Sequence, residues 1–324
     1  MKVSIIIPVY NVSECIKDCL SSVYSQTYNN LEIIIVDDCG VDDSMKRVND
    51  FINKSKIKRD VKIISHTHNR GLSAARNTGV ENATGDYVFF LDSDDVIDVK
   101  CIEHLIAPLK RQSVDFVIGK FIVVNEDKQY SNLVIDEGIY CGNDLIMGLY
   151  TSGYWYAMAW NKLINREFLI NNELYFKEGL LHEDILWSFK LACTANSMYA
   201  VHNETYSYII RKNSISQNLG LKNCNALIEV IADSVSYYTS KYKHENKEVH
   251  NYIERLKISL LENMNKNYSR KVTYDFYKRC RLYIINIKTN NIKEFVRDFH
   301  YRFSPFWGFN YLLFLIKLKR LRIR

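Results

Sequence analysis

The chain has few residues that interrupt regular structure, with 3 prolines and 12 glycines among 324 residues. The loops around Gly71, Gly79 and Gly85 are therefore more informative than usual. The eight cysteines are widely and irregularly spaced, with no CxxC pair and no neighbouring pair of histidines. This spacing argues against a disulfide framework or a zinc site and favours reduced, cytosolic thiols.

The sequence also lacks the features of a signal peptide and of a nucleic-acid-binding protein. The apolar start, residues 3–9, is too short for a signal peptide and contains Pro8, so it fits a buried strand better. The first 220 residues contain no basic face interleaved with base-stacking aromatics and no nucleic-acid-binding module. We therefore expect no nucleic-acid partner.

The overall composition is that of a globular protein, with 47% hydrophobic and 25% charged residues. The chain is longer than a usual domain with a single closed core. This length predicts a large α/β domain followed by a helical extension. The net charge is +6, and residues 299–324 contain no acidic side chain. The positive charge is thus concentrated at the C-terminal end.

Short apolar, β-branched runs alternate with amphipathic stretches in the first 95 residues. This alternation predicts an α/β fold with a doubly wound, mostly parallel sheet, whose ligands bind beyond the carboxyl ends of the strands. The expected strands are residues 3–9, 31–36, 61–65 and 87–91, and the expected helices are 13–25, 44–53 and 72–82.

Beyond residue 95 the pattern is less regular and then becomes helical. We expect a helix over 99–111, a strand over 114–119, a hairpin around 121–139, and helices over 222–241, 247–268 and 274–288. The predicted domains are a catalytic domain (1–215), a helical extension (216–302) and a basic tail (303–324).

Acidic residues follow two of the predicted strands, and Tyr10 follows the first. Asp37 and Asp38 end the second strand, and the run Asp92-Ser93-Asp94-Asp95 ends the fourth. Carboxylates packed together repel one another, so the last cluster is best explained by a divalent cation. Oxygen-only ligands suit Mn²⁺ or Mg²⁺, and we predict Asp92 and Asp94 as the ligands. The alternative is a solvated loop or a helix cap.

The chain resembles the family 2 glycosyltransferases, which have the nucleotide-sugar-binding GT-A fold, and in particular the bacterial enzymes that build capsule or O-antigen. The resemblance covers the chain to about residue 216. It is carried by VSIIIPVYN (3–11), IVDDCGVDDS (35–44), NRGLSAARNTG (69–79), GDYVFFLDSDD (85–95), WNKL (160–163) and His182-Glu183-Asp184. The second segment departs from the family pattern DDGSxDxS, because its turn glycine is displaced by one position.

The resemblance assigns a nucleotide sugar to the crevice. It implies that Tyr10 lies beside the base, that Asp38 accepts a hydrogen bond from it, and that Pro8 shapes the loop. Asp37, Ser93 and Arg76 are implied to contact the donor, with Arg76 near the diphosphate. Asp37 and Asp38 would equally cap the next helix, and Arg76 would equally lie on an exposed helix face.

The remaining implied roles concern catalysis and the acceptor. Asp184 is implied to be the general base, with Glu183 as its neighbour, although acidic residues are also ordinary at helix N-termini. Trp160 and Lys162 are expected at the acceptor, although a lone Trp in an apolar segment is as often a core residue. Finally, Arg211 and Ser214 are expected to close over the donor.

The tail has the pattern of an interfacial amphipathic helix, since its apolar segment is too short to span a bilayer. A helix from residue 310 would place Tyr311, Phe314, Leu315, Leu318 and Leu321 on one face, with Lys317, Arg320 and Arg324 opposite. This predicts attachment to an anionic membrane surface. Docking onto the protein itself, or onto a second copy, is the alternative.

Together these features predict a metal-dependent, inverting hexosyltransferase. It would move a sugar from a UDP-hexose to a polyprenyl-diphosphate-linked saccharide in cell-surface polysaccharide synthesis. The expected location is cytoplasmic, on the inner face of the bacterial plasma membrane. A nucleotidyltransferase and a non-catalytic membrane-surface protein are the alternatives, although no Gly-rich, Lys-containing loop follows the first strand.

Overall fold

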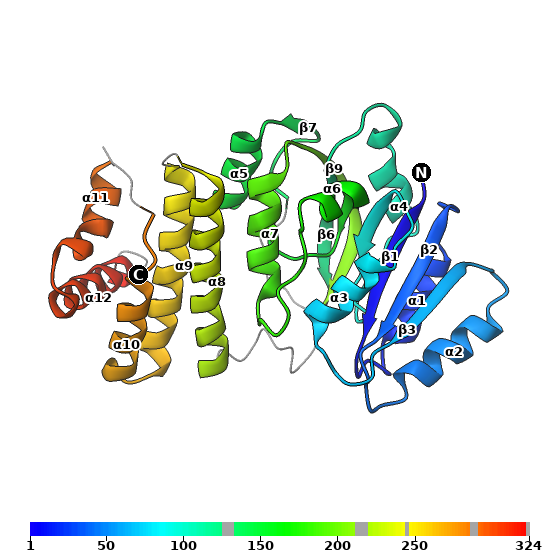
Figure 1. The fold of residues 1–324 in the computed structure, drawn as a ribbon, viewed down its shortest axis with the longest axis horizontal. Coiled ribbons are helices and arrows are strands. Elements are labelled where there is room, and N and C mark those ends of the chain that lie inside the picture. Colours follow the sequence, from blue (N-terminus) through cyan, green and yellow to red (C-terminus); the bar gives the residue numbers. More distant parts are fainter. Residues whose placement is uncertain (125–132, 211–219, 244–245, 286–290, 322–324) are drawn as a thin grey trace. The chain divides into compact units, whose positions relative to one another are not determined.

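The computed structural model describes residues 1–124, 133–210, 220–243, 246–285 and 291–321, with side chains described to residue 318. The chain divides into two compact units, residues 1–218 and 219–324 (Figure 1). Arg211 and Ser214 lie outside the described residues.

The first unit is built on parallel strands, most of which are buried. β1 (Val3–Val9) pairs in parallel with β2 (Leu31–Asp37) and β4 (Tyr87–Phe90), and β2 pairs in parallel with β3 (Asp60–Ser65). Every residue of β1 is buried, which explains its continuous apolar run. The predicted α/β fold is confirmed, and β3, β2, β1 and β4 form the parallel part of its sheet.

The sheet continues with strands of mixed direction, so that the described residues form a nine-stranded sheet in the order β3-β2-β1-β4-β8-β6-β9-β5, with β7 beside β9. β8 (Lys162–Asn165) is antiparallel to both β4 and β6 (Phe116–Val124). β9 (Ser197–Ile209) runs parallel to β6 and antiparallel to β5 (Val96–Ile97). The acidic run Asp92–Asp95 lies between β4 and β5.

The predicted hairpin around residues 121–139 is wrong. β7 (Gly138–Cys141) pairs with β9 and not with β6. The 13-residue strand β9 is long enough to bind β6 along one edge and β7, then β5, along the other. A pattern of neighbouring strands in the sequence cannot reveal a partner that comes sixty residues later.

Helices cover the sheet and connect its strands. In the first unit these are α1 (Ile16–Tyr24), α2 (Ser44–Lys54), α3 (Leu72–Glu81), α4 (Cys101–Ile106), α5 (Asn143–Thr151), α6 (Arg166–Asn171) and α7 (Glu183–Thr194), with a 3-10 turn η1 (Pro108–Lys110). α3 packs against β1 and β2. Gly71 precedes α3 with φ 87°, a conformation that favours glycine.

The helix predicted over residues 99–111 is shorter in the structure. It consists of α4, which ends at Ile106, followed by the 3-10 turn η1.

The second unit is helical. It contains α8 (Leu221–Lys241), α9 (Lys247–Asn267), α10 (Arg270–Cys280), α11 (Ile292–Asp298), a 3-10 turn η3 (Phe299–Arg302) and α12 (Pro305–Leu321). α10 begins four residues before the predicted start at 274, because Ser269 caps it by accepting a hydrogen bond from the Val272 amide. Its last helical residue is Cys280, short of the predicted 288.

The C-terminal helix begins earlier than predicted, at Pro305, which is a favourable first residue for a helix. Phe309, Leu312 and Ile316 are buried, whereas Phe314 and Leu318, two residues of the predicted apolar face, are exposed. α12 packs on α10 and η3. Among the described residues, no helix combines the length and apolar character that crossing a membrane requires.

Candidate active site

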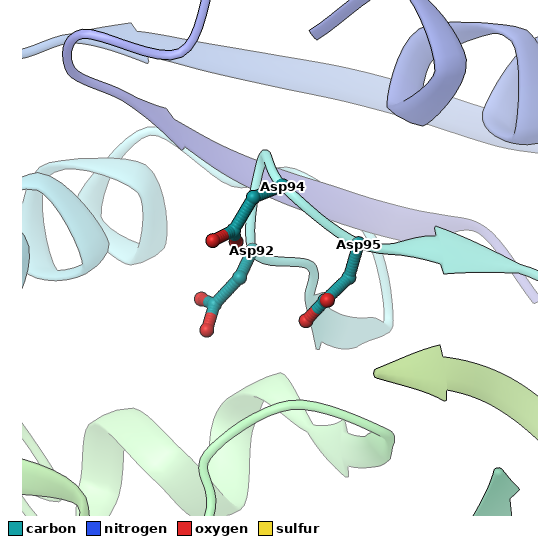
Figure 2. Close-up of side chains that lie close together, drawn as sticks. All are labelled: Asp92, Asp94 and Asp95. Atoms are coloured by element: carbon teal, nitrogen blue, oxygen red, sulfur yellow. The ribbon is translucent and has the colours of Figure 1, made fainter. Parts of the chain in front are cut away.

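Three carboxylates gather on the loop between β4 and β5. Figure 2 shows the side chains of Asp92, Asp94 and Asp95 directed to the same side of this loop. One carboxylate oxygen of each lies within 4.8 Å of the others, and Asp92 and Asp94 are half-buried. An oxygen-only set of this kind fits a hard divalent cation, because Mg²⁺ and Mn²⁺ bind carboxylates and complete their shells with water and phosphate. The predicted pair of ligands thus lies together.

Asp95 was not predicted as a ligand, although it is part of the same acidic run. Its carboxylate accepts hydrogen bonds from the Tyr206 hydroxyl (2.7 Å) and the Ile209 amide (2.8 Å). Burial and the neighbouring Asp92 nevertheless raise the pKa of Asp95 to about 8. A bound cation would favour the charged form of this carboxyl, so the donor set fits a metal better than it fits an empty cluster.

Arg76 joins the acidic loop to the start of α7. Its guanidinium donates to Asp92 at 2.7 Å and to Glu183 at 2.8 Å, and its side chain is only 3% exposed. The guanidinium also lies 5.1 Å from the centre of the Phe176 ring. Arg76 is therefore a buried fork that holds two carboxylates from distant segments, rather than a residue on an exposed helix face.

Asp184 follows Glu183 in the first turn of α7, after His182, which has φ 60°. Its carboxylate accepts a hydrogen bond from the Ile185 amide at 2.9 Å. Burial, then the charge of Glu183, raise the pKa of Asp184 to about 7 against the opposing effect of Arg76. A carboxyl group that titrates near neutrality is suited to accept a proton during a reaction.

The second strand end forms a separate part of the site. The Asp38 carboxylate accepts hydrogen bonds from the amides of Arg70 and Gly71 (both 2.8 Å) and lies 2.6 Å from Nδ1 of His66. His66 in turn contacts the Thr78 hydroxyl of α3 at 2.9 Å. Asp38 thus fixes the loop before α3. His66 was missed because a lone histidine at a strand end carries no local signal.

The other residues implied to contact the donor lie on or beside these loops. Pro8 is buried in β1, and Ser93 is buried between Asp92 and Asp94. Tyr10, the first residue after β1, is 47% exposed. Asp37 accepts a hydrogen bond from the Cys39 amide at 3.1 Å. Cys39 has φ 59° and an exposed side chain.

Trp160 and Lys162 do not have the surface positions expected of acceptor-binding residues. Trp160 is 3% exposed and stacks on Tyr206, with ring centres 4.3 Å apart, and Lys162 is fully buried. The Lys162 ammonium lies 4.3 Å from the centre of the Tyr156 ring, and burial holds its pKa well below the usual value. Trp160 supports Tyr206, whose hydroxyl also accepts a hydrogen bond from the Asp92 amide at 3.3 Å. Trp160 is therefore linked to the acidic loop through Tyr206.

A family model named Glycosyl transferase family 2 matches residues 4–172. The chain belongs to this family. The matched segment contains the acidic run, Asp38 and Arg76, and ends before Glu183.

Individual relatives and solved structures agree with this family. The glycosyltransferase GlyA of Streptococcus pneumoniae is 29% identical over 297 residues, which cover 87% of this chain but only 41% of GlyA. The structure of Staphylococcus aureus TarS (residues 1–349) in complex with UDP-GlcNAc superposes with a TM-score of 0.69 at 21% identity, covering 87% of this chain and 80% of that one.

A more distant structural neighbour was determined with a metal. The mannosyltransferase PcManGT from Pyrobaculum calidifontis, in complex with GDP-Man and Mn²⁺, has a TM-score of 0.53 at 16% identity and covers 87% of this chain and 80% of its own. At these identities the structural likeness establishes the GT-A fold. The chain therefore has the GT-A fold that the resemblance implies.

Proposed function

We propose that this glycosyltransferase is a metal-dependent, inverting enzyme that moves a hexose from a UDP-sugar to a saccharide acceptor. The observation that carries the proposal is the network Asp92–Arg76–Glu183. Through Arg76 it links the acidic loop to Glu183, the residue directly before Asp184. The UDP-GlcNAc bound to TarS supports a uridine nucleotide as the donor.

In this proposal Asp184 is the general base. It removes the proton from an acceptor hydroxyl, the oxygen attacks the anomeric carbon, and the bond from that carbon to the diphosphate breaks in the same step. Attack from the face opposite the leaving group converts an α-linked donor into a β-linked product. The raised pKa of Asp184, about 7, lets the carboxylate hold the proton after transfer.

The acidic loop and Arg76 would act on the other side of the reacting carbon. A cation held by Asp92, Asp94 and Asp95 would neutralise charge that develops on the leaving diphosphate. Arg76 keeps Asp92 and Glu183 in place, because its two terminal nitrogens donate to one carboxylate each. Mn²⁺ and Mg²⁺ both suit this donor set.

We further propose that the acceptor is a polyprenyl-diphosphate-linked saccharide in capsule or O-antigen synthesis. The enzyme would then work on the inner face of the bacterial plasma membrane, where its basic C-terminal segment attaches to anionic lipid. The absence of acidic residues from 299–324 supports this attachment.

The test is release of UDP from a panel of UDP-hexoses, measured with Mn²⁺, with Mg²⁺ and with a chelator. We expect Asp94→Asn to abolish metal-dependent turnover, because it removes a charged ligand without changing the side-chain volume. The matched control is Asp98→Asn: Asp98 is an exposed residue of the same loop region whose carboxylate accepts from the Lys100 amide. Full turnover by the Asp94 variant, or equal loss in the control, would contradict the proposal.

A further inference from the structure

The helix α12 is apolar on two opposite sides. One side carries the buried residues described above, and the other carries Trp307, Phe314 and Leu318, which are 65%, 58% and 41% exposed. At about 100° per residue, positions seven and eleven apart share one side of a helix. A helix that is apolar all round is normally buried or lies in a membrane. Three large apolar side chains therefore face outward together.

A groove lies along the same helix, between these two sides. It has a volume of about 430 Å³ and is bounded by the end of α9, the start of α10 and α12. Its polar wall consists of Arg270, Lys317, Asn265 and Asn310, and Phe314 forms part of its apolar wall. None of these lining residues is acidic. The groove thus combines two cations, two amides and an apolar edge.

The guanidinium of Arg270 is held at this groove. It donates to the side-chain oxygen of Asn310 and lies 5.8 Å from the centre of the Phe309 ring. A guanidinium has five N–H donors in a planar fork, a geometry that matches two oxygens of a phosphate. Lys317 is exposed and lines the same groove. The pair has the chemistry of a phosphate-binding site with an apolar border.

We propose that this groove binds the phosphate of an anionic phospholipid while Trp307, Phe314 and Leu318 enter the bilayer interface. The inference deepens the proposed membrane attachment and rests on it, since it names the lipid class and the residues. Trp is favoured at the membrane interface, where its ring is partly wet, and each basic residue near an anionic surface strengthens binding. The helix would lie in the interface rather than cross it.

Charge favours a lipid over a second copy of the chain as the occupant. α12 carries Lys317, Lys319 and Arg320 and no acidic residue. Two copies meeting through this face would bring like charges together, whereas anionic headgroups neutralise them. The exposed apolar side of α12 and its cations would then both contact the bilayer, because a bilayer has hydrocarbon and phosphate at adjacent depths.

The experiment is sedimentation of the whole 324-residue chain with vesicles of phosphatidylcholine, with and without phosphatidylglycerol. We expect Arg270→Gln/Lys317→Gln to weaken binding to the anionic vesicles roughly thirtyfold, from about fivefold per charge. Trp307→Ser/Phe314→Ser should weaken binding to both kinds of vesicle. Lys317→Gln alone, with about a fivefold loss, covers the case in which removing Arg270 disturbs α12.

The matched control is Lys266→Gln/Lys271→Gln, which removes the same charge from exposed neighbours that do not line the groove. An equal loss in this control would overturn the groove in favour of diffuse electrostatic attraction. Sedimentation velocity without vesicles tests whether the occupant is a second copy of the chain. A dimer that Trp307→Ser/Phe314→Ser abolishes would contradict the proposed lipid and favour a second copy.

The readout also separates this inference from the proposed function. Vesicle binding needs no donor, and turnover of soluble UDP-sugar should be unchanged in the groove variants. Normal vesicle binding by Arg270→Gln/Lys317→Gln contradicts the groove and leaves the catalytic proposal intact. Metal-independent turnover by Asp94→Asn contradicts the catalytic proposal and leaves the groove intact.

Discussion

The backbone of Gly79 in α3 lies directly against the side chain of Ile6 in β1. A Cβ added at Gly79 would stand 2.2 Å from Cγ2 of Ile6, far inside van der Waals contact. This close approach seats α3 on the parallel strands. Since Arg76 is one turn earlier on the same helix, the spacing between α3 and β1 also sets the position of the guanidinium that holds Asp92.

Gly79→Ala should therefore destabilise the first unit by about 1–3 kcal/mol, because the extra methyl group overpacks a filled core. Urea unfolding followed by fluorescence measures this change. Ile6→Ala removes the side chain that the new methyl group would meet, so the double variant should lose less stability than the sum of the two single variants, a favourable coupling in a double-mutant cycle. Gly148→Ala is the control: it lies in α5 with nothing within 4 Å, so alanine should be neutral or stabilising by up to about 1 kcal/mol. A destabilised control and an unaffected Gly79 variant would contradict the packing argument.

Arg76→Ala should reduce the free energy of unfolding by about 3 kcal/mol or more, since it leaves two largely buried carboxylates without their cation. Adding Glu183→Gln should restore part of that stability, because one of the stranded charges is removed. The same double variant should stay inactive in sugar transfer, which separates stability from function. A loss below about 1 kcal/mol for Arg76→Ala would mean that the pairs contribute little.

Asp184→Asn should lower kcat by about 10²–10⁴-fold while leaving the KM for the donor nearly unchanged, because the general base acts only as the acceptor proton moves. Initial rates with a saturating acceptor measure both constants. Asp144→Asn, at an acidic residue in the first turn of α5, is the matched control for an acidic side chain at a helix start. A variant with raised donor KM and unchanged kcat would assign Asp184 to binding instead.

The first unit should lose stability in acid through Glu32. Burial alone would raise the pKa of this carboxyl, but hydrogen bonds from Lys2, Ser4 and Thr84 outweigh it and lower the pKa to about 2. A folded-state pKa below the unfolded value of about 4.5 contributes stability above pH 4.5, which is lost as the pH falls toward 2. The contribution is on the order of 3 kcal/mol.

Urea unfolding from pH 7 to pH 2 tests this contribution. Glu32→Gln should lower the stability at pH 7 and flatten its decline below about pH 4.5. Glu14→Gln, at an exposed position, should leave the whole pH profile unchanged. If Glu32→Gln kept the full acid-induced decline, the responsible carboxyl group would lie elsewhere.

Local sequence patterns predicted the strands and helices well where one element is set by its own residues. The strand β1 and the acidic cluster after β4 could be predicted from local sequence. A strand buried on both faces has a continuous apolar run, and a cluster of like charges is recognisable as a candidate metal site. Helix ends were less accurate where a single cap decided them, as Ser269 does for α10.

The remaining errors concern contacts between distant segments. Tyr206 reaches Asp95 across 111 residues, and Glu183 reaches Arg76 across 107, so neither pairing has a periodic signal. The same reason explains why β7 was assigned to the wrong neighbour. Trp160 was read from its residue type, whereas its burial depends on Tyr206, which lies on another strand.

Cys39 offers a practical route to watching the enzyme work. Its thiol is exposed on the loop that follows Asp38, and Cys141 is the other exposed residue among the eight cysteines. After Cys141→Ser, a maleimide dye would label this loop selectively, since the other thiols are buried or half-buried. Fluorescence from that position would test the expected binding of a donor beside Asp38, without a radioactive sugar and before the identity of the sugar is known.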